Sequence, residues 1–143
     1  MSVHKADIDL ALALADAAGA AIRPYFRREM GLEIKADNSP VTLADREAEA
    51  AMRRILEAER SGDGIHGEEY GVKDGVTGRQ WVLDPIDGTR SFTVGRPIFG
   101  TLIALVDNGW PVLGIIDQPI AGERWLGVTG RPTMAKGSAS PPA

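Results

Sequence analysis

The most informative segment of the sequence reads Trp81-Val82-Leu83-Asp84-Pro85-Ile86-Asp87-Gly88-Thr89. Its apolar start, with Gln80 before it, predicts a buried strand that delivers Asp84 at its end. Pro85 has no N–H for a ladder and Gly88 tolerates a tight turn, so the strand is expected to stop here. Two carboxylates three residues apart on a stiff turn can point at one location, where their repulsion is costly unless a cation lies between them. The sequence therefore predicts a metal site at Asp84 and Asp87.

Oxygen ligands dominate the surroundings of this site. The chain has no cysteine, and ligand sets made of oxygen alone favour a hard ion such as Mg²⁺. Upstream, the loop segment Gly67-Glu68-Glu69-Tyr70-Gly71 can supply a third carboxylate. After Asp87, the backbone N–H groups of Gly88 and Thr89 are expected to open a short helix, and a helix start is a ready anion site. Each motif also has a purely structural explanation, because an Asp-Gly pair is most often a plain turn and paired glutamates are most often solvated.

Composition and charge exclude several classes of function. The chain has 143 residues, of which 43% are hydrophobic and 25% charged, as in an ordinary globular protein with one core. A net charge of -4 argues against a sequence-independent nucleic-acid binder, which needs a basic face. The longest strongly apolar run, Leu102 to Val106, is too short to span a bilayer, and the polar start has no signal-peptide core. We therefore expect no membrane partner and a cytoplasmic location.

Periodicity predicts two helices followed by strands. Apolar spacings of three and four predict helices at Asp7–Arg28, with Pro24 kinking the last turn, and at Leu43–Arg60. Thr42 and Asp45 form a capping-box pattern at the second start, so Asp45 is most simply a cap. Strands are expected at Ile98–Val106, Trp110–Ile116 and Arg124–Val128, the first two joined by a hairpin turn at Asp107-Asn108-Gly109. The fold class is therefore α+β, with two N-terminal helices packed on a mainly antiparallel sheet.

Three motifs in order carry a family resemblance. They are Ser39-Pro40-Val41-Thr42-x-x-Asp45, Gly67-Glu68-Glu69 and the Trp81–Thr89 stretch. Their order and spacing, across residues 5 to 131, resemble the inositol monophosphatase family of metal-dependent phosphatases. Haloacid-dehalogenase-type phosphatases are disfavoured, because their two aspartates lie two residues apart, whereas Asp84 and Asp87 lie three apart.

The resemblance implies a ligand set for two Mg²⁺ ions. Glu68, Asp84 and the carbonyl oxygen of Ile86 would bind the first ion. Asp84 would bridge to a second ion, which Asp87 would also hold. The same resemblance implies that the substrate is a small-molecule phosphate monoester.

It also implies catalytic and phosphate-binding roles. Glu68 and the Thr89 hydroxyl would position and activate the attacking water, with Asp45 orienting Thr89. The backbone N–H groups of Gly88 and Thr89 would hold the phosphate oxygens.

The substrate expectation rests on two later motifs. Asp117-Gln118-Pro119 and Glu123-Arg124-Trp125 resemble the histidinol-phosphatase branch, which implies hydrolysis of L-histidinol phosphate in histidine biosynthesis. Two alternatives stay open: a phosphatase for inositol 1-phosphate or a related sugar phosphate, and an inactive, truncated metal-binding remnant.

The resemblance also predicts the domain organisation. Residues 1–131 would form the N-terminal metal-binding phosphatase domain, the N-terminal half of the layered αβαβα fold of the family. From Pro132 the sequence turns rich in Gly, Ser, Ala and Pro, so residues 132–143 are expected to be disordered, with the C-terminal family domain missing. Apolar surface along the strands from Ile98 to Trp125 would then lie open, and we expect a homodimer.

Overall fold

The computed structural model describes residues 3–27 and 40–136. Lys35 and Ser39, with most of the loop expected at Gly31–Val41, lie outside these ranges. So do residues 137–143 of the expected disordered tail.

Helix α1 spans Lys5–Ile22 and is followed by a 3₁₀ turn, η1, at Arg23–Tyr25. It starts two residues earlier than predicted, and the backbone N–H of His4 donates to Asp7 Oδ2 at 2.8 Å, which fixes the start. Its α-helical part ends well before the predicted Arg28. The reason is Pro24, which removes an N–H and changes the last turn from α to 3₁₀ geometry.

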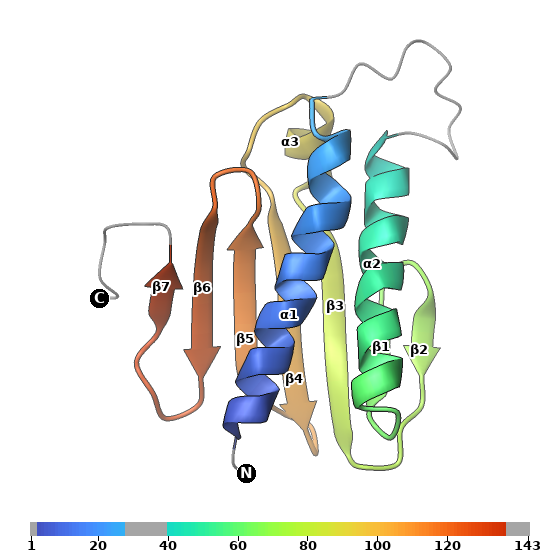
Figure 1. Ribbon diagram of the computed structural model, residues 1–143, viewed down its shortest axis with the longest axis vertical. Helices are drawn as coiled ribbons and strands as arrows, with labels where there is room; N and C mark the ends of the chain where they lie inside the picture. The colour runs from blue at the N-terminus through green and yellow to red at the C-terminus, as the bar shows by residue number, and fades with distance from the viewer. Residues whose placement is uncertain (1–2, 28–39, 137–143) are drawn as a thin grey trace.

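Helix α2 spans Pro40–Glu59 and runs antiparallel to α1 (Figure 1). It starts three residues before the predicted Leu43, because a proline suits the first helical position. Thr42 and Asp45 therefore lie inside the helix, and the prediction that they form a capping box at its start is wrong. Asp45 is instead buried, 9% exposed.

Seven strands form one sheet in the order β2-β1-β3-β4-β5-β6-β7. Their bounds are β1 Gly64–Gly67, β2 Gly71–Lys73, β3 Arg79–Asp87, β4 Gly100–Asp107, β5 Trp110–Gln118, β6 Glu123–Val128 and β7 Met134–Lys136. The pair β1 and β3 is parallel, and the other pairs are antiparallel. The predicted α+β class, with two helices on a mainly antiparallel sheet, is confirmed.

Two predicted boundaries differ from the structure. Strand β3 runs on to Asp87 instead of ending at Leu83, since the pairing with β4 resumes at Asp87↔Gly100 after a register shift. Pro85 thus interrupts the ladder without ending the strand. In the expected tail, Met134–Lys136 pair with β6, whose unpaired backbone edge offers hydrogen-bond partners even to a polar segment. The expectation of disorder is therefore wrong for these three residues.

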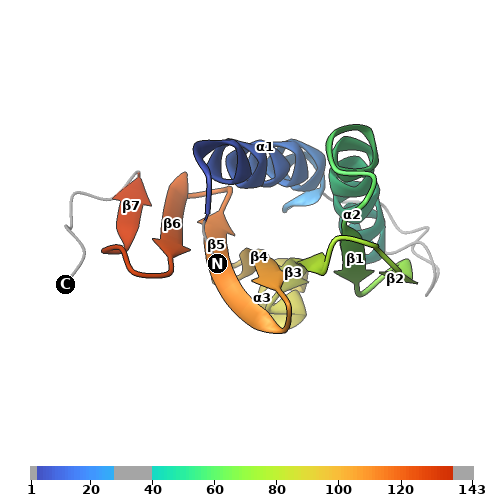
Figure 2. The same cartoon turned by 90° about the horizontal axis from the view of Figure 1, so that it is seen from below.

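Both helices cover the same face of the sheet (Figure 2). The short helix α3, Thr89–Thr93, lies at one end of the sheet and contacts α2 (Figure 1). Within the described part of the chain, no other helix covers the opposite face. Helix α1 packs on β4 and β5, and α2 packs on β3. Alternation along the strands sends one set of side chains into this core: Ile65, Trp81, Leu83, Ile103, Leu105, Leu113, Ile115 and Leu126. Among the described residues, no helix has the length and apolarity needed to cross a bilayer.

Candidate metal centre

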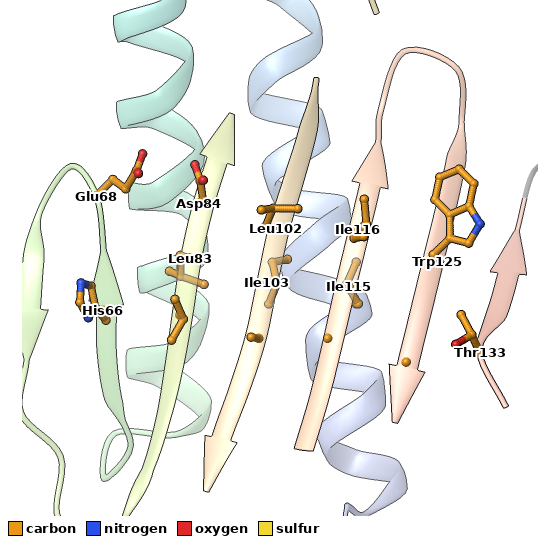
Figure 3. A pocket seen from close by; sticks show the side chains of 14 residues that line it. His66, Glu68, Leu83, Asp84, Leu102, Ile103, Ile115, Ile116, Trp125 and Thr133 are labelled. Carbon is orange, nitrogen blue, oxygen red and sulfur yellow. The ribbon is translucent and has the colours of Figure 1, made fainter. Parts of the chain in front are cut away.

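Acidic side chains from three elements meet near one end of β1 and β3. Glu68 follows β1 directly, and Asp84 lies in β3. Because the parallel register pairs Gly67 with Leu83, the next residues, Glu68 and Asp84, lie side by side (Figure 3). Asp45 reaches the same region from α2, since its pKa responds to the charges of both.

The electrostatics of Asp45 show how crowded this region is. Burial raises the pKa of Asp45 to about 7, helped by the negative charges of Glu69, Asp84 and Glu68. A hydrogen bond from the Ile86 backbone partly opposes this rise. That hydrogen bond comes from Ile86 and not from the Thr89 hydroxyl, so the role of Asp45 in orienting Thr89 stays a prediction.

The pKa of Asp84 is also raised. Burial raises its pKa to about 6, and the charges of Glu68 and Asp87 add to the effect. A hydrogen bond with Glu68 and the charge of Glu49 raise it further. The predicted convergence of Glu68, Asp84 and Asp87 is thus present as a set of mutually repelling carboxylates.

The donor set fits a hard divalent cation. Asp45 Oδ1 and Asp84 Oδ1 are buried and accept no hydrogen bond from the described residues. A buried polar atom without a partner is costly, and a cation would supply the missing positive charge. Every donor here is an oxygen, which suits Mg²⁺. Within residues 3–27 and 40–136, no three acidic or histidine groups stand in a closed metal-ligand cluster, so the carboxylates share one region rather than one finished coordination shell.

The bulge of β3 places Ile86 and Asp87. Between Asp84 and Asp87 the register with β4 shifts, and Ile86 buries its side chain while Asp87 is exposed. The hydroxyl of Thr101, which has no exposed surface, donates to the Pro85 carbonyl at 2.8 Å and ties the bulge to β4. Sequence reasoning missed Thr101, because nothing in its local pattern sets it apart from any other strand threonine.

Gly88 turns the chain from the bulge into helix α3, Thr89–Thr93. Its φ of +97° is left-handed, and a Cβ there would lie 2.9 Å from the Ile98 carbonyl oxygen, so only glycine fits. Thr89 is the first residue of α3 and is exposed. The ring of Phe92 packs edge-on against Phe99 with centroids 5.2 Å apart, which anchors α3 to the segment before β4.

Sequence reasoning also missed Glu49, a buried carboxylate in the middle of α2. It lies four residues after Asp45, on the same helix face as the buried Ala48 and Met52. An acidic residue on the apolar face of a predicted helix was the available signal.

The motifs behind the histidinol-phosphatase expectation build the turn between β5 and β6. The side-chain amide of Gln118 donates to the Phe99 carbonyl at 3.1 Å and accepts from the backbone N–H groups of Ile120 and Ala121. Arg124 donates to Asp117 Oδ1 at 2.7 Å. The side chains of Gln118, Asp117 and Arg124 are thus engaged in hydrogen bonds and an ion pair within and next to this turn. The structure does not place them beside Glu68 and Asp84.

The open sheet face carries an apolar row leading away from Asp84. The register aligns Asp84, Leu102, Ile116 and Trp125 across β3, β4, β5 and β6. These side chains line a concave region of about 720 Å³ that also includes His66 and Glu68 (Figure 3). The carboxylates thus stand at the rim of a largely apolar surface.

Comparisons with known proteins agree on a family. The model of the inositol monophosphatase family matches residues 5–142. The bifunctional phosphatase IMPL2, chloroplastic, of Arabidopsis thaliana is 53% identical over 127 residues, which are 87% of this chain and 37% of that protein. The histidinol-phosphatase of Mycobacterium tuberculosis is 44% identical over 130 residues, 90% of this chain and 50% of that one.

A solved structure of an inositol monophosphatase from Zymomonas mobilis is 58% identical, with a TM-score of 0.83 over 96% of this chain and 53% of that chain. The chain therefore spans about half the length of the histidinol-phosphatase and the solved structure that it matches. The match of the family model, the sequence identities and the shared fold show that this chain belongs to the inositol monophosphatase family.

Proposed function

We propose that this chain carries the metal-binding half of a magnesium-dependent phosphomonoesterase. Glu68, Asp84, the Ile86 carbonyl oxygen and Asp87 would hold Mg²⁺. The observation that carries the proposal is the pair of buried, unpartnered carboxylate oxygens on Asp45 and Asp84, set beside Glu68 in a region of strong like-charge repulsion. Family membership supports the reaction class.

Each group of the proposed site has a separate role in hydrolysis. Bound Mg²⁺ would neutralise phosphate oxygens and favour departure of the alkoxide. Glu68 would accept a proton from the attacking water, with the Thr89 hydroxyl orienting that water for in-line attack on phosphorus. The backbone N–H groups of Gly88 and Thr89 would bind phosphate oxygens, since the first N–H groups of a helix have no partner within it. The phosphorus–oxygen bond to the alcohol would break as the bond to water forms. The leaving oxygen would take a proton from bulk water, and Glu68 would return its proton to bulk water.

L-Histidinol phosphate is the proposed substrate, as a step of histidine biosynthesis. The name of the Mycobacterium tuberculosis relative supports this choice. Inositol 1-phosphate, or a related sugar phosphate, is the second candidate, favoured by the solved inositol monophosphatase at 58% identity. Asp117, Gln118 and Arg124 do not separate the two, because their side chains serve the β5–β6 turn.

Phosphate release from a panel of esters tests the proposal. We expect histidinol phosphate to be hydrolysed faster than inositol 1-phosphate, and EDTA to abolish both reactions. Glu68→Gln and Thr89→Ala should each lower kcat by about 10²–10⁴-fold, the usual effect of losing a positioned base or orienting group. The Mycobacterium tuberculosis relative serves as positive control for the assay. Hydrolysis that survives EDTA, or that is unchanged in both variants, would contradict the proposed chemistry; a reversed substrate preference would overturn only the substrate.

We also propose that the chain pairs with a second copy. Support comes from the apolar row on the open sheet face, where Ile116 is 52% exposed. An exposed apolar patch of this kind promotes association.

A further inference from the structure

Glu49 is an acidic residue in a place where charge is expensive. It sits in α2 with no exposed surface. Its carboxylate is fully engaged: Oε1 accepts from the Glu69 backbone N–H at 2.9 Å, and Oε2 accepts from the Tyr70 backbone N–H at 2.9 Å and from Arg53 Nε at 3.0 Å. A buried carboxylate is tolerated when donors surround it in this way.

All three donors lead to one segment, the turn between β1 and β2. Glu69 and Tyr70 belong to that turn directly, immediately after Glu68. Arg53 donates a second hydrogen bond to the Gly71 carbonyl, and its guanidinium lies 5.9 Å from the centroid of the Tyr70 ring. Two side chains of helix α2, Glu49 and Arg53, therefore hydrogen-bond to the backbone of Glu69, Tyr70 and Gly71.

Gly67 shows how closely the carboxylate fits the start of the turn. A Cβ on Gly67 would collide with both carboxylate oxygens of Glu49. The last residue of β1 thus packs its backbone against Glu49, and the two residues after Glu68 hydrogen-bond to it. The residues before and after Glu68 therefore both contact the side chain of Glu49.

We propose that Glu49 is a positioning residue that fixes the β1–β2 turn so that the Glu68 carboxylate faces Asp84. Fixing the peptide groups on either side of Glu68 fixes the direction of its Cα–Cβ bond. Glu49 acts through the turn, because its oxygens already accept hydrogen bonds from Arg53 and from the Glu69 and Tyr70 backbone, while its charge also acts on Asp84. The consequence for Mg²⁺ affinity rests on the proposed function; the consequence for the order of the turn does not.

Glu49→Gln is the central variant. Glutamine keeps the shape of the side chain, but one acceptor oxygen becomes an NH₂ donor, so at least one of the three converging donors loses its partner. Glu57→Gln is the matched control, with the same loss of charge at an exposed position on the same helix.

Amide hydrogen exchange measures the order of the β1–β2 turn in the absence of metal. In Glu49→Gln, measured in EDTA, the Glu69 and Tyr70 amides should exchange about tenfold faster than in the wild type, because their acceptor is weakened. Exchange in α1 and in Glu57→Gln should stay at the wild-type rate. Unchanged exchange at Glu69 and Tyr70 in a folded Glu49→Gln protein would overturn the inference.

Calorimetric titration with Mg²⁺ supplies the second measurement. We expect the dissociation constant of Glu49→Gln to rise about tenfold, the lower end of the usual effect for residues that orient metal ligands. A merely structural role would change the thermal midpoint in EDTA but not the affinity of the folded protein. If wild-type protein binds no Mg²⁺, the proposed function fails, and the exchange result alone decides the role of Glu49.

Gly67→Ala keeps the test decisive if Glu49→Gln does not fold. Its added methyl group would collide with the same carboxylate and displace it. Faster exchange at Glu69 and Tyr70 supports the inference, and wild-type exchange overturns it.

Discussion

The hydroxyl of Thr101 ties the bulge of β3 to β4. Thr101→Val leaves the Pro85 carbonyl without its donor in a buried place, so unfolding should become easier by about 1–3 kcal/mol. The Mg²⁺ dissociation constant should also rise, because Ile86 and Asp87 lie on that bulge. Urea unfolding and calorimetry measure the two effects.

Thr129→Val is the matched control for Thr101. Its hydroxyl also donates to a proline carbonyl, that of Pro111 at 3.2 Å, but it is exposed and water can replace it. We expect a change within about 0.5 kcal/mol. Equal losses in the two variants would show that the bulge has no special dependence on Thr101.

Asp7 gives the protein an acid-sensitive ion pair. Burial raises the pKa of Asp7, but hydrogen bonds from the His4 backbone, Arg79 and Arg60 outweigh burial and hold it below the ordinary 3.8. Arg60 and Arg79 approach Asp7 Oδ1 at 2.8 and 2.9 Å. Because the folded pKa lies below the unfolded one, the unfolded chain binds more protons, and the free energy of unfolding falls as pH drops below about 4.

The variant Asp7→Asn measures how much the ion pairs of Asp7 stabilise the fold. It should cost about 3 kcal/mol at about pH 7, because Arg60 and Arg79 each lose one of their carboxylate contacts, and less as the pH falls. Unfolding curves of both proteins between pH 3 and about pH 7 measure the difference. A difference that stays constant over this range would contradict the pKa direction.

Residues with a local signature could be predicted from the sequence, and residues that act across the fold could not. Glu68, Asp84 and Asp87 stand in short acidic motifs, and the structure gathers them in one region. Glu49 and Thr101 hydrogen-bond to backbone groups 20 and 16 residues away, Glu69 and Pro85, so their roles depend on tertiary packing.

At the scale of elements, the turn from β3 into α3 depends on Gly88. Both Gly88 and Gly109, in the β4–β5 hairpin, have left-handed φ, +97° and +87°. An alanine at either position should cost about 1–2 kcal/mol of backbone strain. Gly88→Ala should cost more, because its Cβ also meets the Ile98 carbonyl at 2.9 Å, whereas nothing lies within 4 Å at Gly109. Urea unfolding of the two variants measures this excess, and equal losses would argue against a close fit at Gly88.

Element types could be predicted from periodicity, and their ends could not. The hairpin turn at Asp107-Asn108-Gly109 was predicted, and Asp107 indeed pairs with Trp110. The end of β3 was missed, because sequence alone does not show that β4 offers a partner for Asp87 beyond Pro85. The strand Met134–Lys136 was missed for the same reason, since its order comes from the edge of β6.

In the whole molecule, one face of the sheet is covered by helices (Figure 2). The other face carries exposed apolar side chains such as Ile116. We expect concentration-dependent association through that face. Ile116→Thr keeps a β-branched side chain but removes apolar area, and should weaken association about tenfold, as losing roughly 1.4 kcal/mol would. Val76→Thr, at a 92% exposed position between β2 and β3, should leave it unchanged. Sedimentation velocity measures both, and a monomeric wild type at all concentrations would rule out the homodimer.

If the carboxylates around Asp84 form a Mg²⁺ site, calorimetric titration of the 143-residue chain with Mg²⁺ should detect it. Wild-type protein and Asp74→Asn, altered at an exposed aspartate between β2 and β3, should bind Mg²⁺ alike. Asp84→Asn should remove the binding, because the proposed site then loses the carboxylate shared by both ions. If Asp84→Asn binds Mg²⁺ as tightly as the wild type does, Asp84 is not a ligand and the proposed metal site is wrong.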